Sequence, residues 1–83
     1  AACGLRKLFD DLAAAQAPAA RTAGVRIACR AGTAAAFTDA GMLAGLLGRL
    51  LDNAIRAVPP GGTVLLAART RGDAVRIEVR DNG

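Results

Sequence analysis

The sequence predicts an α/β (α+β) fold, a two-layer sandwich in which helices cover one face of a mixed β-sheet. Two segments repeat apolar residues three and four positions apart, which indicates amphipathic helices. Two others alternate apolar and polar residues, which indicates half-buried strands, and stretches containing Pro or Gly separate these segments. A chain of 83 residues predicts one small domain with a limited core.

The first predicted helix covers residues 4–17. Its apolar positions share one face, and charged residues occupy the other; the apolar positions are Leu5, Leu8, Phe9, Leu12 and Ala13. Pro18 is expected to end this helix, because proline lacks the backbone N–H that the helix requires. Residues 19–24 are then expected to form a connector.

A half-buried strand is predicted over residues 25–29, where Val25, Ile27 and Cys29 alternate with arginine or alanine. Residues 31–32, Ala-Gly, predict a turn, because glycine tolerates backbone angles that other residues avoid. Residues 34–37 predict a second, short strand.

The second predicted helix covers residues 39–58, with Thr38 or Asp39 as its N-cap. Its apolar stripe consists of Leu43, Leu46, Leu47, Leu50, Leu51, Ala54 and Val58. Its three glycines, at positions 41, 45 and 48, suggest close packing against the sheet. Residues 59–62, Pro-Pro-Gly-Gly, end the helix. Strands over residues 63–70 and 74–81 then flank Arg71-Gly72-Asp73 and predict a hairpin.

Composition narrows the classes of function. The net charge is +4, and the ten arginines are spread along the sequence without interleaved aromatic residues, so a solvated basic surface is expected and nucleic-acid binding is not. Cys3 and Cys29 form no metal-binding pattern and predict free thiols in a reducing cytosol. No stretch predicts a signal peptide or a membrane span, so this segment is expected to be cytoplasmic and to make no membrane contact; a parent protein could still be anchored in the inner membrane.

The second helix carries the first candidate site. Arg49, Asn53 and Arg56 share a face away from the leucine stripe, and Asp52 lies beside them. In one interpretation this is a solvated face on which Asp52 pairs with the arginines. In the other, the Asn53 amide oxygen is a ligand of Mg²⁺ beside a triphosphate, and Arg56 reaches the phosphate oxygens.

The second candidate site is the end of the last strand. Asp81 has the same parity as Val75, Ile77 and Val79, so it is expected to face the interior if the strand persists. A buried carboxylate needs a donor, and the exocyclic amine of adenine could serve as one. The alternative is that Asp81 opens a turn with Asn82 and Gly83 and stays hydrated.

Three motifs together resemble a known family. They are Leu-Leu-Asp-Asn-Ala-Ile-Arg-Ala at 50–57, Pro-Pro-Gly-Gly-Thr-Val at 59–64, and Val-Arg-Ile-Glu-Val-Arg-Asp-Asn-Gly at 75–83. This arrangement resembles the catalytic ATP-binding domain of bacterial sensor histidine kinases, the Bergerat fold. The resemblance covers nearly the whole chain and implies that residues 1–83 are the N-terminal part of that domain, cut within its G1 box, with an incomplete histidine-kinase ATPase fold.

The resemblance implies a role for each matching residue. Asn53 implies the Mg²⁺ ligand of the N box, Arg56 a phosphate contact, Asp81 the adenine-reading acid of the G1 box, and Gly83 its first glycine. Position 49 departs from the family, which usually has Asn or Glu there. Arg49 cannot act as a general base, so hydrolysis is disfavoured, and a phosphate contact and a pairing with Asp52 both stay open.

The implied function is that of an ATP- and Mg²⁺-binding part of a two-component kinase. The chain contains no histidine, so the γ-phosphoryl group would pass to a histidine on a separate dimerisation domain and, indirectly, to a response regulator. No catalytic residue is assigned within this segment, which is expected to be inactive alone. The alternative is a non-catalytic interaction module of the same fold, a pseudokinase or an anti-sigma-type partner binder. Exposed apolar sheet surface is expected to make the segment self-associate.

Overall fold

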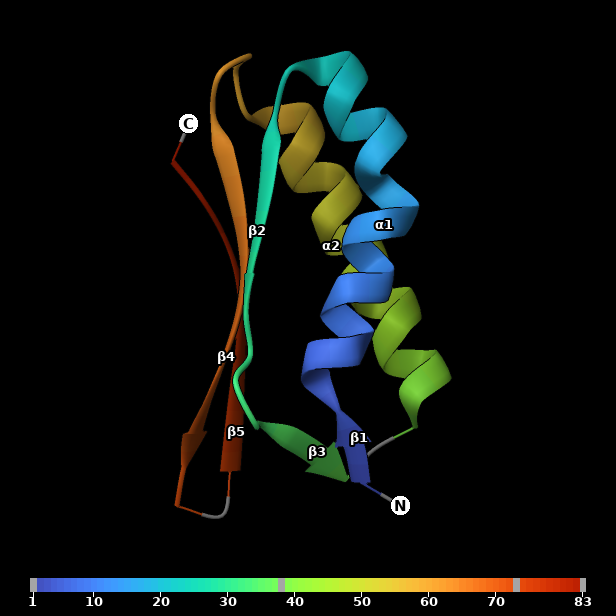
Figure 1. Cartoon of the computed structure of the whole chain (residues 1–83), viewed down its shortest axis with the longest axis vertical. Helices are drawn as coiled ribbons and strands as arrows, with labels where there is room; N and C mark the ends of the chain where they lie inside the picture. Colours follow the sequence, from blue (N-terminus) through green and yellow to red (C-terminus); the bar gives the residue numbers. More distant parts are fainter. Residues whose placement is uncertain (1, 38, 73, 83) are drawn as a thin grey trace.

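A computed structural model of the chain describes residues 2–37, 39–72 and 74–82. Its elements, in order, are β1 Ala2–Gly4, α1 Leu5–Ala23, β2 Arg26–Arg30, β3 Ala35–Phe37, α2 Ala40–Ala57, β4 Thr63–Arg71 and β5 Ala74–Asp81. Both helices lie on the same side of the sheet formed by β2, β4 and β5 (Figure 1). The predicted two-layer sandwich is therefore confirmed.

The main sheet is mixed, with the strand order β2-β4-β5. Strand β2 runs parallel to β4, with Arg26 beside Thr63, and β4 runs antiparallel to β5. Because α2 lies between β2 and β4 in the sequence, it supplies the crossover that a parallel pair requires. Strands β1 and β3 form a separate antiparallel pair near the N-terminus (Figure 1), and β1 was not expected from the sequence.

The core lies between the two layers. Phe9 of α1, Leu51 of α2 and both Val64 and Leu66 of β4 have no exposed surface. Neighbouring strand residues point alternately to the two faces, so Val64 and Leu66 define the helix-covered face of β4. The largest buried side chains of both helices and of the central strand thus belong to one core.

Helix α1 does not end at Pro18, and the expected connector is helical up to Ala23. Proline removes one hydrogen bond, to the carbonyl of Ala14, but both residues are exposed and water can satisfy that carbonyl. Continuing the helix buries Ala20, which is 5% exposed. The helix ends instead at Gly24, whose φ of 71° suits a glycine and whose N–H bonds the last helical carbonyls.

Helix α2 begins as predicted at an aspartate cap. The Asp39 carboxylate accepts a hydrogen bond from the Met42 N–H at 3.1 Å, while Thr38, the other candidate, lies outside the described residues. The predicted apolar stripe is wrong at two positions, because Leu46 and Leu50 are 57% and 44% exposed. Ile55, which the prediction omitted, is 2% exposed and joins Leu47 and Leu51 in the core.

The glycines of α2 do not mark close packing against the sheet. A side chain at Gly48 would contact Leu12 of α1 at 3.9 Å, and one at Gly45 would meet no atom within 4 Å. Gly41 lies next to the Asp39 carboxylate. The nearest element to this face of α2 is therefore the other helix, and the prediction failed because periodicity alone does not identify the packing partner.

The predicted hairpin is confirmed. Strand β5 pairs with β4 along its whole length, from Arg71 opposite Ala74 to Val64 opposite Asp81. Gly72 adopts a φ of 57° in the connecting turn, and Asp73 lies outside the described residues. Strand β2 is likewise confirmed, with its start one residue later than expected.

Candidate functional site

The exposed face of α2 brings three predicted residues together. Arg49, Asn53 and Arg56 are all exposed, on the side opposite the buried residues of the helix. The same face carries three apolar side chains with large exposed fractions: Met42 at 75%, Leu46 at 57% and Leu50 at 44%. Asn53 therefore stands on a surface that is partly apolar and flanked by two guanidinium groups.

Asp52 pairs with only one of the two arginines. Its carboxylate lies 3.4 Å from Nε of Arg56, while no carboxylate of the described residues lies within ion-pair distance of Arg49. The Arg56 side chain is 77% exposed, so this pair is a surface contact worth at most about 0.5 kcal/mol. Such a weak pair leaves the guanidinium able to exchange its partner for a stronger anion.

Asp81 is the last residue of β5, and its position departs from the prediction. It keeps the parity of Val79 and pairs with Val64, yet it is exposed rather than interior. The reason is its place at the end of an edge strand, which the described helices do not cover. The carboxylate is therefore hydrated and needs no partner within the described chain.

Asn82 fixes this end of the sheet and was predicted only as a turn former. Its side-chain oxygen accepts a hydrogen bond from the Thr63 N–H at 2.7 Å, and its own N–H donates to the Thr63 carbonyl at 3.2 Å. A Cβ at Gly62 would collide with the Val58 side chain and approach the Asn82 amide. The double role of Asn as turn former and hydrogen-bond acceptor was the only signal for this contact in the sequence.

These contacts place the two candidate sites at one end of the molecule. Helix α2 packs against β4 and β5, and its C-terminal end lies at the same end of the fold as the end of β5 (Figure 1). Asn53 and Arg56 occupy that half of the helix, and Asp81 ends the strand. No hydrogen bond or ion pair joins them within the described part of the chain, and Gly83 lies outside it.

Comparison with solved structures identifies the fold. The chain superposes over its full length on the catalytic domain of histidine kinase ThkA, with a TM-score of 0.89 and 18% identity, covering 58% of that chain. The histidine kinase AdeS of Acinetobacter baumannii gives 0.90, at 16% identity and 42% coverage. A histidine kinase of Burkholderia phymatum gives 0.83, at 28% identity over 95% of this chain and 37% of the other.

The chain has the fold of a histidine kinase catalytic domain.

Sequence similarity agrees with this fold. Over 45 residues, or 54% of the chain, it is 47% identical to the sensor protein DivL of Caulobacter vibrioides. No protein-family model matches the chain. The chain spans 6% of DivL and 58% of the ThkA catalytic-domain chain, so it corresponds to a part of each. The predicted resemblance to the catalytic ATP-binding domain of sensor histidine kinases is confirmed.

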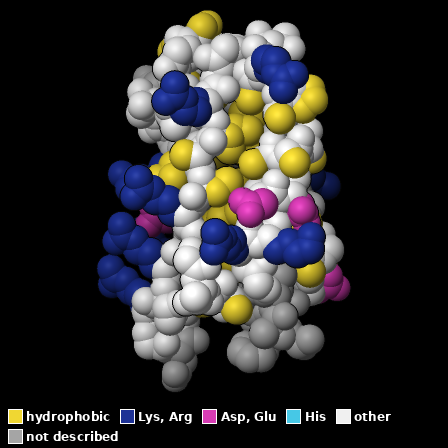
Figure 2. Space-filling model, viewed as in Figure 1, with side chains coloured by type: hydrophobic (Ala, Val, Ile, Leu, Met, Phe, Trp, Pro, Cys, Tyr) yellow, Lys and Arg dark blue, Asp and Glu magenta, His cyan; other side chains and the backbone are white. Residues whose placement is uncertain are grey.

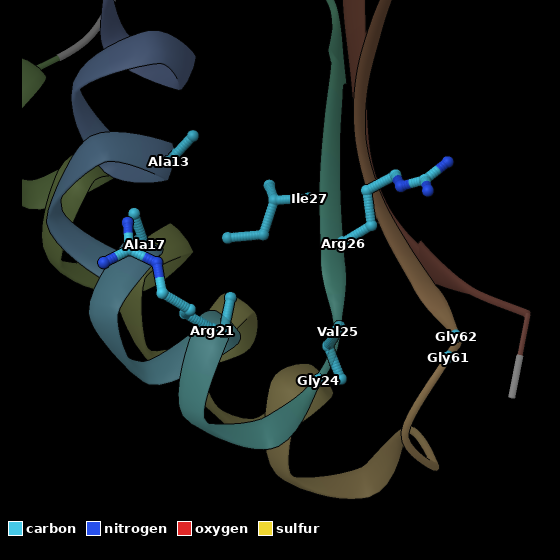
Figure 3. A pocket seen from close by; sticks show the side chains of 10 residues that line it. Ala13, Ala17, Arg21, Gly24, Val25, Arg26, Ile27, Gly61 and Gly62 are labelled. Atoms are coloured by element: carbon cyan, nitrogen blue, oxygen red, sulfur yellow. The ribbon is translucent and has the colours of Figure 1, made fainter.

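This chain also has a groove that none of the candidate site residues lines. About 570 Å³ in volume, it lies between α1 and β2, where Ala13, Ala17 and Ile27 line it (Figure 3). Arg26 points to the other side of the strand (Figure 3). Small alanine side chains leave this space open, and the described groove carries no carboxylate, amide side chain or thiol. We therefore assign the candidate site to the α2 and β5 residues.

Neither cysteine nor carboxylate clusters point to a metal centre within this fold. No group of three metal-ligating Cys, Asp or Glu side chains occurs in residues 2–37, 39–72 and 74–82. Cys29 is half-buried, and its Sγ donates to the Phe9 carbonyl at 3.8 Å. Burial, and to a smaller extent the Asp10 carboxylate, raises the pKa of the Cys29 thiol, so the thiol is protonated at neutral pH.

Neither described helix has the length and hydropathy of a membrane span.

Proposed function

We propose that residues 1–83 are the N-terminal part of the ATP-binding domain of a sensor histidine kinase. In the complete protein this domain binds ATP with Mg²⁺ and presents the γ-phosphoryl group to a histidine on a separate dimerisation domain. A response regulator then receives the phosphoryl group. The main support is the placement of Asn53, Arg56 and Asp81 at one end of a histidine kinase fold. We expect the domain to work in the cytoplasm, with a membrane anchor elsewhere in the parent.

Asn53 suits a magnesium ligand. Its amide is exposed and makes no hydrogen bond with another described residue, so its oxygen is available to a ligand. Mg²⁺ takes few protein ligands and completes its shell with phosphate oxygens and water. When bound, the ion would neutralise charge on the phosphates. Arg56 and Arg49, one turn to either side, would contact the phosphate oxygens.

Asp81 suits an adenine-reading group. Its carboxylate is exposed at the end of β5 and can accept a hydrogen bond from an exocyclic amine. Guanine carries an oxygen at the corresponding position, which would repel the carboxylate. Gly83, two residues further on, would allow the backbone to approach the ring. The exposed apolar face of α2 beside Asn53 offers further contact surface.

Arg49 favours a second candidate function. An arginine cannot activate water, and in this chain it stands where the family usually has an amide or a carboxylate. A non-catalytic module that binds a protein partner and no nucleotide would keep the same fold without the amide or carboxylate at position 49. Nucleotide binding by the domain therefore discriminates between the two functions.

The test is calorimetric titration of a non-hydrolysable ATP analogue into this chain and into a chain extended past Gly83. Asn53→Ala is expected to weaken binding about tenfold or more with Mg²⁺ and little in EDTA, because its effect passes through the metal. Asp81→Ala should weaken binding in both conditions and reduce the preference for ATP over GTP. Asp11→Ala removes an exposed carboxylate on α1 and serves as the control.

Unchanged affinity in both site variants of the extended chain would exclude this site assignment. Absence of any nucleotide binding by a folded extended chain would favour the interaction module.

A further inference from the structure

The strand register gathers most of the arginines on the helix-free face of the sheet. In β4, the residues that alternate with buried Val64 and Leu66 point away from the helices. The pairings carry this face across all three strands. Six of the ten arginines lie on it, and all six are exposed: Arg26, Arg30, Arg69, Arg71, Arg76 and Arg80. The arginines that look scattered in the sequence are therefore clustered in space, and we call this surface the arginine face.

Two acidic residues accompany the arginines in the described part of the chain: Glu78 lies on the arginine face, and Asp81 lines its hollow. Glu78 is 28% exposed and lies 3.0 Å from Arg76 and 3.8 Å from Arg80. It therefore offsets a small part of the positive charge. Figure 2 shows dark-blue side chains gathered on the side of the molecule where β4 and β5 lie.

Two arginines of this face repel each other when no partner is bound. Arg69 and Arg76 lie directly opposite each other on β4 and β5. Like charges directly opposite each other destabilise a sheet, about as much as a good pair stabilises it. Glu78 relieves Arg76 in part, and Arg69 has no ion-pair partner among the described residues. An external carboxylate between the two would remove this repulsion.

The centre of the arginine face is concave and combines apolar with charged side chains. A hollow of about 530 Å³ has small or apolar side chains in its lining, among them Ala28, Leu65 and Ala67. Its polar and charged lining residues include Arg30, Arg69, Glu78, Arg80, Asp81 and Asn82. Protein–protein interfaces combine apolar and polar surface in this way, and arginine is enriched in them. The hollow offers space for a side chain of a partner.

Three other occupants suit this face less well. Single-stranded nucleic acid usually stacks its bases on aromatic side chains, and this chain has no Trp or Tyr, while Phe9 is buried between the layers. A second copy would bring two arginine faces together. A bilayer surface is usually held by protruding apolar side chains as well as charge, and Leu65 is half-buried.

We propose that the arginine face docks an acidic protein surface, whose carboxylates pair with the guanidinium groups while an apolar side chain enters the hollow. Guanidinium groups bind carboxylates through two parallel hydrogen bonds, which gives such a contact its geometry. Asn53 lies on α2, across the sheet from this surface, whereas Asp81 borders the hollow, so the two proposals share one residue and are tested with different variants.

The test uses fluorescence anisotropy of a short labelled poly-L-glutamate with this chain at near-physiological salt. The face variant is Arg30→Gln with Arg69→Gln, and the matched control is Arg6→Gln with Arg21→Gln on α1, which changes net charge equally. The face variant is expected to weaken binding about tenfold, and the control less than about threefold. Circular dichroism checks that both remain folded.

A second variant covers the case in which the glutamine substitutions unfold the chain. Arg30→Lys with Arg69→Lys keeps the charge and removes the planar fork, and it should still weaken binding measurably. Equal losses in the face and control variants would overturn the proposal. Tighter binding of a single-stranded oligonucleotide, or of phosphatidylserine-rich vesicles, than of poly-L-glutamate would overturn the assignment of the occupant.

Discussion

Asn82 joins the end of β5 to the start of β4 through its side chain and its backbone, both bonded to Thr63. This closes the sheet at the end where Asp81 lies. Asp81 was expected from strand parity to be interior, but it is exposed because parity gives the face of a strand and not the extent of the layer above it. Asn82 thus holds the backbone at this end of the sheet, whereas its neighbour Asp81 is the residue proposed to bind adenine.

Asn82→Ala is expected to lower the free energy of unfolding by about 1 kcal/mol, because the Thr63 N–H loses its acceptor. Asn82→Asp keeps an acceptor and should cost less. Asn53→Ala, an exposed amide without a protein partner among the described residues, should change stability by less than about 0.5 kcal/mol. Urea denaturation measures all three, and equal losses for Asn82→Ala and Asn53→Ala would contradict this role for Asn82.

Cys29 is expected to react slowly with iodoacetamide at pH 8, because burial and the Asp10 carboxylate raise the pKa of its thiol and only the thiolate reacts. Asp10→Asn removes a negative charge, lowers that pKa and should speed alkylation. Asp11→Asn is the matched control and should have a smaller effect. All variants carry Cys3→Ser, so that mass spectrometry follows one thiol; faster alkylation of the control than of Asp10→Asn would contradict the prediction.

At the scale of elements, the sequence predicted the helices and strands of the sandwich well and some of their ends poorly. Asp39, one of two cap candidates, and residues 59–62 carry strong capping and breaking chemistry, and α2 begins and ends close to them. The prediction that Pro18 ends the first helix was wrong. The effect of proline on a helix depends on whether the carbonyl of Ala14 is exposed to water, which is a property of the fold. Strand β1 has three residues and forms only by pairing with β3, so no local pattern predicts it.

The candidate site was predictable in part. The shared face of Arg49, Asn53 and Arg56 follows from helical geometry, and their exposure agrees with it. The choice of Arg56 over Arg49 as the partner of Asp52 depends on side-chain conformations that spacing does not specify. The arginine face was not predicted, because its six arginines are separated along the sequence. Their alternation within the strands nevertheless places them on one face of the sheet.

Pro18→Ala is expected to stabilise the chain by about 1–3 kcal/mol, because alanine restores the hydrogen bond to Ala14 and has the best helix propensity. Loss of the rigidity that proline gives the unfolded chain offsets part of this gain. Pro18→Gly restores the same N–H and should be about 1 kcal/mol less stable than Pro18→Ala. Thermal denaturation measures both, and a lower Tm for Pro18→Ala than for the parent chain would contradict this explanation.

At the scale of the whole molecule, the exposed apolar surface lies on α2 rather than on the sheet. The described large apolar side chains with the greatest exposure, Met42, Leu46 and Leu50, project from the helix layer, whereas Leu65, Val75 and Ile77 of the sheet are only partly exposed. Self-association stays a prediction, now assigned to the helix. Like charges would oppose contact between two arginine faces.

Leu46→Gln with Leu50→Gln is expected to raise the dissociation constant for self-association about tenfold or more, because each leucine contributes roughly 1.5–3 kcal/mol when fully buried. Leu65→Gln, at the centre of the arginine face, is the control and should have little effect. Sedimentation velocity over a range of concentrations measures both. A monomeric parent chain at high concentration, or a larger effect of Leu65→Gln, would contradict this assignment.

The mixed pairing of the sheet has a consequence for the order in which the chain acquires its structure. The β4–β5 hairpin joins neighbouring segments, while β2 must find β4 across the whole of α2. Closing the longer loop costs more chain entropy, so we expect the hairpin and α2 to organise before β2 docks. Substitutions at Ile77 should then slow refolding, and substitutions at Ile27 should mainly speed unfolding, which stopped-flow measurements in denaturant can separate.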